Sequence, residues 1–167
     1  SKIEPAELVK QIKAKHLQGL VITEHHYLWT EEELLELRKE SEVENSFLIL
    51  SAQEIESEIG HILLFGADHT LPSLGQPYEL ASIRKLFPDA AIIWAHPFRK
   101  GRQPSKAELL NKHIDAVEIF NTNQTLKENY TGLSEWHRHK FTAVSGSDTH
   151  AVDTAGAYPT LFDHPVN

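Results

Sequence analysis

Gly19-Leu20-Val21-Ile22-Thr23-Glu24-His25-His26 is a short apolar run that ends abruptly in ionisable side chains. The run predicts a buried strand over residues 19–23, because its apolar positions are continuous rather than helically spaced. Runs of the same kind recur along the chain. We expect further strands over residues 47–51, 61–66, 90–95, 115–120 and 141–145.

Helical stretches separate most of these expected strands. We expect helices over residues 4–16, 31–40, 78–87, 105–112 and 125–140. Thr30 and Glu33 have the spacing of a capping box, which marks the start of the second helix. Strands that alternate with helices favour a largely parallel sheet. Two architectures fit this pattern, an open doubly wound sheet and a β/α barrel, and both place ligand chemistry at the carboxyl ends of the strands.

The composition limits the classes of function that fit. The chain has 167 residues, 16 Lys and Arg against 24 Asp and Glu, and a net charge of −8. This acidic balance argues against stable nucleic-acid binding, which needs a basic face. There is no apolar run long enough to span a membrane and no signal-peptide pattern, so we expect a cytoplasmic protein. The sequence lacks cysteine, which excludes disulfides and thiolate metal sites, yet it contains 11 histidines.

The histidines and acids fall where the expected strands end. Four such ends release a histidine, a carboxylate or both, and the residues that follow them are Glu24, His25, His26, Gln53, Glu54, His96, Asp148 and His150. A fifth expected strand carries Glu118 and is followed by Asn121 and Asn123. The carboxyl ends of parallel strands meet at one edge of a sheet, so we expect these side chains to converge. Imidazole and carboxylate ligands without cysteine suit Zn, Mn or Fe with open coordination positions.

Each of these residues, taken alone, also has a purely structural interpretation. His25, His26 and His96 could simply be loop residues that follow a strand. Asp148 and His150 are more specific, because side chains two apart in an extended segment point the same way. His61 opens its strand rather than closing it, so it reaches the same edge only if that strand runs antiparallel to its neighbours. The remaining histidines are interpreted as surface or helix-end residues.

In these motifs the chain resembles the PHP (polymerase and histidinol phosphatase) family. The family's T-D-H motif corresponds to Thr23-Glu24-His25, with Glu in place of Asp, and its strand-end glutamate corresponds to Glu54. Its next histidine corresponds to His61, and its His-Pro strand end to His96-Pro97. Its last motif, G-S-D-x-H, is intact at residues 146–150. The resemblance spans most of the chain.

The resemblance implies a distorted (β/α)7 barrel that holds two or three divalent ions at its carboxyl face. It implies that Glu54 bridges metal ions and that the other ligands are His25, His61, His96, Asp148 and His150. Glu54, His96 and Asp148 would also take part in catalysis. Arg99 lies three residues after His96, and its guanidinium could bind a substrate phosphate.

The chain departs from the family pattern at both ends. The family's first H-x-H motif and a further ligand would lie upstream of Ser1, and the family continues into another helix after the position of Asn167. We therefore expect a single PHP-like domain over residues 1–167 that is incomplete at both ends. A chain without the upstream ligands is expected to bind fewer ions and could be inactive.

The resulting hypothesis is metal-dependent hydrolysis of a phosphoester, either a small phosphomonoester or a nucleotide or oligonucleotide. Bound divalent cations would lower the pKa of water and neutralise phosphate oxygens that an acidic protein otherwise repels. Two alternatives stay open, a catalytically silent metal-binding module of PHP type and a metal-dependent amidohydrolase that acts on non-phosphate substrates. No membrane partner is expected, and the oligomeric state cannot be inferred from the sequence.

Overall fold

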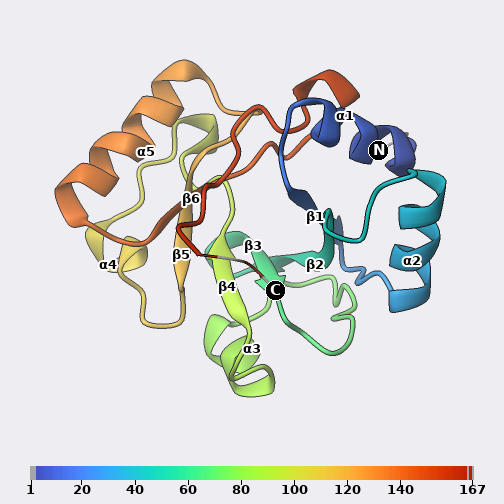
Figure 1. Cartoon of the computed structure of the whole chain (residues 1–167). Helices are drawn as coiled ribbons and strands as arrows, with labels where there is room; N and C mark the ends of the chain where they lie inside the picture. The colour runs from blue at the N-terminus through green and yellow to red at the C-terminus, as the bar shows by residue number, and fades with distance from the viewer. Residues whose placement is uncertain (1–2, 165, 167) are drawn as a thin grey trace.

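The computed structural model describes residues 3–164 and 166, and six strands form its single sheet. The strands follow one another across the sheet in chain order, and the sheet curls into an open half-barrel (Figure 1). They are β1 (Gly19–His25), β2 (Leu48–Ser57), β3 (Gly60–Phe65), β4 (Ala91–Trp94), β5 (Ala116–Phe120) and β6 (Ala143–Ser145). All six overlap the expected strands, although β1 and β2 run further than expected, to His25 and Ser57.

The direction of β3 decides what meets at the edge of the sheet. The pair β1 and β2 is parallel, as are the pairs β4–β5 and β5–β6, whereas β3 is antiparallel to both β2 and β4. The carboxyl ends of five strands and the start of β3 therefore lie at one edge of the sheet.

The expected (β/α)7 barrel is wrong. The described residues form six strands rather than seven, and no pairing joins β1 to β6 to close the sheet. In addition, β2 runs on through polar residues to Ser57, where a tight turn leads directly into β3 at Gly60. A hairpin of this kind leaves no room for the crossover helix that parallel strands require. The same hairpin excludes a fully parallel, doubly wound sheet.

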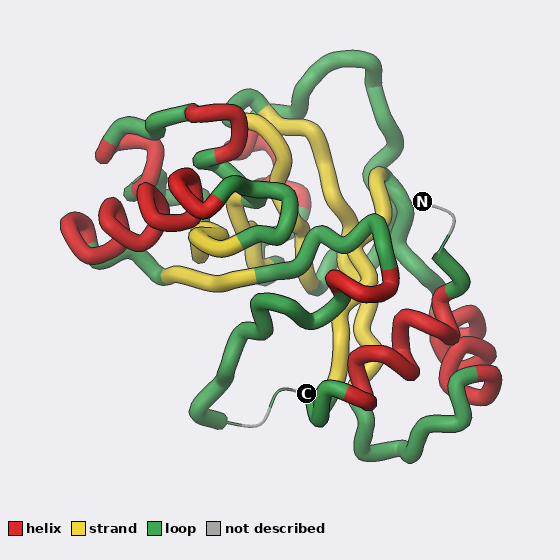
Figure 2. The backbone as a smooth tube through the Cα atoms, turned by 90° about the horizontal axis from the view of Figure 1, so that it is seen from above, coloured by secondary structure: helices red, strands yellow, loops and turns green. Residues whose placement is uncertain are grey.

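Two groups of helices flank the strands on opposite sides, as Figure 2 shows. The helices are α1 (Pro5–Ala14), α2 (Glu31–Glu40), α3 (Leu80–Leu86), α4 (Lys106–Leu109) and α5 (Leu126–His139). Of these, α3 lies at the bottom of the view in Figure 1. The expected capping box of Thr30 and Glu33 is confirmed, and α4 and α5 begin with the same motif. Each box satisfies backbone N–H groups that the first turn leaves unpaired.

Two separate apolar clusters hold the sheet to its helices. The smaller one joins α1 and α2 to β1 and includes Val9, Ile22 and Leu37. The larger one lies behind β2 to β5 and includes the fully buried Ile62 and Trp94. Because the residues of the larger cluster alternate along β3, β4 and β5, the positions between them face the concave side of the sheet, where the candidate site lies.

The segment 151–160 connects the two ends of the open sheet. After β6 it returns along that strand, where the hydroxyl group of Thr160 accepts a hydrogen bond from Ser145 N and donates one to Ser145 O. Further back, Ala155 is completely buried in the cluster under α1, and Lys15 Nζ donates to Ala155 O. The segment thus ties β6 to α1, which covers the opposite end of the sheet (Figure 1).

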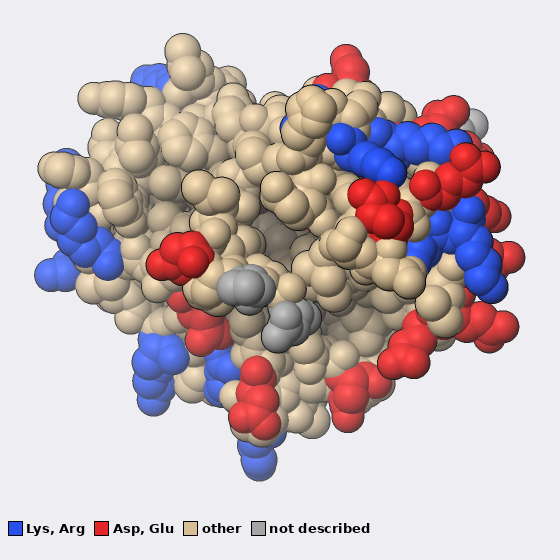
Figure 3. Space-filling view, viewed as in Figure 1, with Lys and Arg blue, Asp and Glu red and all other residues tan. Residues whose placement is uncertain are grey.

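Charged side chains of both signs are interspersed over α1 and α2 on the face shown in Figure 3. An ion pair joins Lys13 of α1 to Glu44, which follows α2, at 2.6 Å. The centre of the same face is hollowed and is lined mostly by uncharged residues. In the part of the chain that the structure describes, no helix is both long and apolar enough to cross a lipid bilayer.

Candidate metal centre

Three imidazole rings surround the carboxylate of Glu54. Its Oε1 atom lies 2.5 Å from Nδ1 of His61 and 3.4 Å from Nε2 of His96, and its Oε2 atom lies 3.6 Å from Nε2 of His25. The ring centroids of His25 and His61 are 5.4 Å apart, and those of His61 and His96 are 5.2 Å apart. The structure therefore brings together four of the six predicted ligands.

Each member of this group comes from a different element of the sheet. Glu54 lies within β2 and pairs with His25, the last residue of β1. His61 is the second residue of β3, and His96 follows the end of β4. The antiparallel direction of β3 is what brings His61 to the edge where the other strands end.

Exposure falls steeply across the group. The side chain of His25 is 62% exposed, that of His61 36%, that of His96 11% and that of Glu54 only 8%. The carboxylate is thus at the bottom of the site, and the imidazoles line a path from it to solvent.

The electrostatics of the group favour an ionised Glu54. Burial by itself raises the pKa of Glu54, but hydrogen bonds to His61 and His96 and the charge of His25 outweigh burial and hold this pKa well below its usual range. The hydrogen bond to Glu54 correspondingly raises the pKa of His61, despite partial burial and the nearby charge of Arg99. In this arrangement, the protonated imidazole of His61 supplies a positive charge that balances the carboxylate of Glu54.

The same position could hold a divalent cation. The ligand atoms of His25, Glu54 and His61 all lie within 4.8 Å of one another. Imidazole nitrogens with a carboxylate oxygen are a donor set suited to Zn, Mn or Fe. A cation at this position would replace the proton on His61 as the partner of Glu54.

Asp148 and His150 form a second group with Arg99 and Asn123. Oδ2 of Asp148 accepts hydrogen bonds from Arg99 Nη2 at 2.7 Å and from Asn123 Nδ2 at 3.0 Å. Nδ1 of His150 lies 2.9 Å from the backbone oxygen of Asp148. Among the described residues, neither Asp148 nor His150 joins the cluster of ligand atoms around Glu54.

The expectation that residues 148–150 are extended is wrong. Asp148 has φ 43°, in the left-handed region, so the backbone turns at this residue. The turn lets Asp148 point back toward Arg99 and Asn123. The two groups are close enough to influence each other electrostatically. The charge of Arg99 lowers the pKa of His61, and the charge of Asp148 raises the pKa of Glu118.

Glu118 is a site residue to which the sequence assigned no role. It lies in β5, only 4% of it is exposed, and its Oε2 atom accepts hydrogen bonds from His96 N at 2.7 Å and from Asn121 Nδ2 at 3.0 Å. Burial raises the pKa of Glu118 to about 7, against the opposing effects of these two hydrogen bonds. The position of this charged residue inside the apolar run 116–120 was the feature of the sequence that could have indicated its importance.

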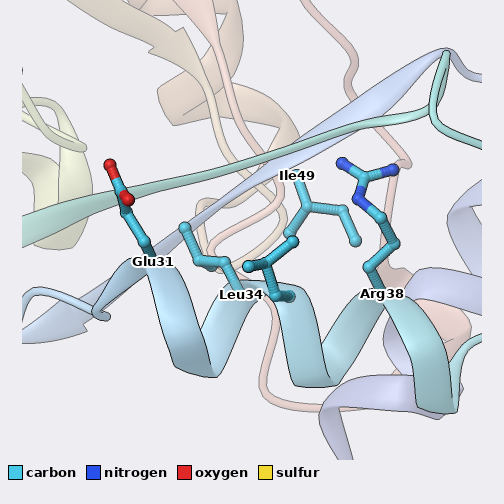
Figure 4. Close-up of a pocket in the computed structure, with 5 residues that line it drawn as sticks. Glu31, Leu34, Arg38 and Ile49 are labelled. Carbon is cyan, nitrogen blue, oxygen red and sulfur yellow. The ribbon is translucent and has the colours of Figure 1, made fainter.

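A shallow pocket elsewhere on the molecule lacks comparable chemistry. It lies between α2 and β2 and is lined by Glu31, Leu34, Leu35, Arg38 and Ile49 (Figure 4). Arg38 already donates to the backbone oxygens of Glu44 and Phe47. This pocket contains no histidine and is separate from the group around Glu54.

Two solved structures share the fold of this chain. One is PsfC from Pseudomonas syringae PB-5123, with a TM-score of 0.66 and 15% identity, covering 90% of this chain and 69% of that one. The other, from Bifidobacterium adolescentis, is named as a proposed metal-dependent phosphoesterase. Its TM-score is 0.63 at 14% identity, covering 93% of this chain and 86% of that one. The likeness is one of fold. No family model and no curated protein matches the sequence.

Proposed function

We propose that this chain is a metal-dependent phosphoesterase of the PHP type. The observation that carries the proposal is the convergence of His25, His61 and His96 on the buried carboxylate of Glu54. Three imidazoles from separate elements around one ionised acid supply the kinds of ligand atom that divalent cation sites use. The fold shared with a protein named as a proposed metal-dependent phosphoesterase supports the same activity.

His25, Glu54, His61 and His96 would hold the cation. When bound, a divalent ion supplies hydroxide from water near neutral pH and neutralises phosphate oxygens. The low pKa of Glu54 keeps the carboxylate ionised and ready to act as a ligand across the physiological range. His25 is the most exposed of the three imidazoles, so it lies at the solvent side of the site.

Asp148 and His150 would complete the ligand set for a second or third ion. Oδ2 of Asp148 is held by Arg99 and Asn123, whereas among the described residues the polar contact of Oδ1 is one of 3.9 Å with Nδ1 of His150. That oxygen remains available for a cation. In this proposal Asp148 acts with Glu54 and His96 in catalysis.

Arg99 would bind the substrate phosphate. Its guanidinium side chain is 27% exposed and pairs with Asp148, and its positive charge lowers the pKa of His61. A phosphate dianion would compete with Asp148 for this group, because charge-assisted contacts between arginine and phosphate are strong. The substrate class is a small phosphomonoester or a nucleotide.

The test combines metal analysis with hydrolysis assays on the 167-residue chain. Purified protein is loaded with Zn²⁺, Mn²⁺ or Fe²⁺ and assayed on p-nitrophenyl phosphate, nucleoside monophosphates, a lactone and an amide, with and without chelator. Phosphoester hydrolysis that is lost on chelation supports the proposal. Equal activity in metal-free protein contradicts it, and preferential amide or lactone hydrolysis identifies an amidohydrolase.

A metal-binding module without turnover is the second candidate. It is favoured by the separation of Asp148 and His150 from the group around Glu54, and by the pairing of Arg99 with Asp148. This candidate predicts that the chain binds metal tightly, loses stability on chelation and hydrolyses none of the substrates. The same assays separate the two candidates.

A further inference from the structure

The carboxyl group of Glu118 connects three strand ends behind the candidate metal centre. Glu118 lies in β5, its Oε2 atom accepts from the backbone N–H of His96 after β4, and its Oε1 atom lies under Gly146 after β6. The residue is 4% exposed, so solvent does not replace these contacts.

We propose that Glu118 is a positioning residue, which holds His96 in the conformation that aims its imidazole at Glu54. The inference rests on the proposed metal centre and adds a specific role for a side chain that does not itself reach the cation. It predicts that removal of the carboxyl group weakens metal binding even where the protein remains folded.

The backbone of His96 explains why it needs support. His96 has φ 34°, a left-handed backbone conformation that residues other than glycine rarely adopt. Such a conformation persists only where surrounding contacts hold it. The 2.7 Å hydrogen bond from His96 N to Glu118 is one such contact, and Nε2 of the same residue lies 3.4 Å from Glu54. Without the carboxyl group, the peptide can relax and the imidazole can turn away.

A chain of side-chain amides links the same carboxyl group to the second group of ligands, and its members Asn121 and Asn129 are buried. Asn121 donates to Glu118 through Nδ2, and its Oδ1 accepts from the backbone N–H of Asn123. Asn123 in turn donates to Oδ2 of Asp148. Asn129 of α5 binds the backbone N and O of Asn121, which anchors the loop. Glu118 therefore links the His96 and Asp148 sides of the site.

Gly146 leaves the space that the carboxyl group occupies. A Cβ atom at this position would lie 2.5 Å from Oε1 of Glu118, closer than non-bonded atoms approach. The backbone of Gly146 is not in the left-handed region, so alanine there would cost little in backbone strain. A substitution of Gly146 thus acts chiefly by displacing the carboxyl group.

The experiment measures Zn²⁺ and Co²⁺ affinity by calorimetry and Co²⁺ absorbance, with circular dichroism to establish the folded fraction. Glu118→Ala is expected to lower the affinity per folded molecule 10- to 100-fold, the usual effect of losing a group that orients a metal ligand. Glu118→Gln is expected to retain most of the affinity, because its amide oxygen still accepts from His96 N. Ile83→Ala, which shortens a fully buried side chain in α3, is the control for general destabilisation.

The outcomes are distinguishable from failure of the proposed function. If the unmodified chain binds no metal, the proposed function fails. If it binds metal and Glu118→Ala binds it equally well, the positioning role is contradicted. Loss of affinity to the same extent in Ile83→Ala contradicts the role as well, since the effect would then follow stability alone.

A double substitution tests the contact between Gly146 and Glu118 directly. Gly146→Ala is expected to lower metal affinity about 10-fold when Glu118 is present. In the Glu118→Ala background the same change should have little further effect, because no carboxyl group remains to be displaced. Additive losses in the double variant would overturn this part of the argument.

Discussion

Nδ1 of His61 lies 2.5 Å from Oε1 of Glu54, although the ladder places His61 directly opposite Glu56. Glu54 and Glu56 are two residues apart and share one face of β2, so His61 is the diagonal neighbour of Glu54 on that face. Glu54 is buried, and Glu56 is exposed. The imidazole therefore reaches along the hairpin toward the buried carboxylate, where His25 and His96 also point.

Removing the charge of Glu54 should abolish tight metal binding. Glu54→Gln removes the carboxylate around which the three imidazoles lie. We expect the affinity for Zn²⁺ to fall at least about 100-fold, because loss of a direct ligand should exceed the 10- to 100-fold effect of losing a group that only orients a ligand. Glu56→Gln is the matched control, because it makes the same change on the same face of β2 and should leave the affinity within a few-fold. Calorimetry on both variants checks the prediction, and retained binding in Glu54→Gln would contradict it.

Metal affinity should rise with pH through neutrality. The hydrogen bond to Glu54 raises the pKa of His61, so this imidazole still carries a proton in metal-free protein above pH 6.5. A cation must displace that proton, and its binding therefore becomes easier as the pH rises through the pKa of His61. Competition titrations between pH 6 and pH 9 should show increasing affinity and proton release on binding. Affinity that is flat over this range would contradict the prediction.

The stability of metal-free protein should carry a contribution from Glu118 that falls as the pH rises from about 4.5 to about 7. Burial raises the pKa of Glu118 to about 7, so over this interval the folded state binds a proton that the unfolded state has released. Stability then declines by at most about 1.4 kcal/mol per pH unit for this group.

Glu118→Gln cannot titrate, so the difference in urea stability between it and the unmodified chain isolates this contribution. Relative to the unmodified chain, the variant should become steadily more stable across the same interval. The lowered pKa of Glu54 changes the stability below this pH interval, and the raised pKa of His61 changes it mainly above the interval. The contributions of the three groups to the pH dependence of stability can therefore be separated. A constant difference between the two proteins would contradict the assignment.

Arg99 should affect substrate binding more than metal binding. Arg99→Met removes the guanidinium that we assign to the phosphate, and we expect KM for a phosphomonoester to rise about 10-fold or more while metal affinity stays within a few-fold. Lys100→Met is the matched control, since it removes a neighbouring, exposed positive charge. Steady-state kinetics on both variants separates KM from kcat. An unchanged KM in Arg99→Met would assign this residue to structure, through its pair with Asp148.

Several features could be predicted from local sequence patterns. The positions of the strands and helices follow from apolar runs, helical spacing and the capping box of Thr30 and Glu33, because these are short-range effects. The convergence of His25, Glu54 and His96 could also be anticipated, since each follows or ends an apolar run. Parallel strands are sufficient to bring these three residues to one edge of the sheet.

Tertiary structure decided the rest. Whether β3 runs antiparallel depends on the tight turn at residues 58–59, and the strand count and open sheet edges depend on pairing over long distances in the chain. The side chain of Asp148 turns toward Arg99 because of one left-handed backbone angle, and Glu118 acquires its role only from the packing of β4, β5 and β6 around it. The sequence by itself determined which residues can bind a cation, because that is a property of their side chains. Which of them meet was decided by strand direction and packing, which arise from contacts between residues far apart in the chain.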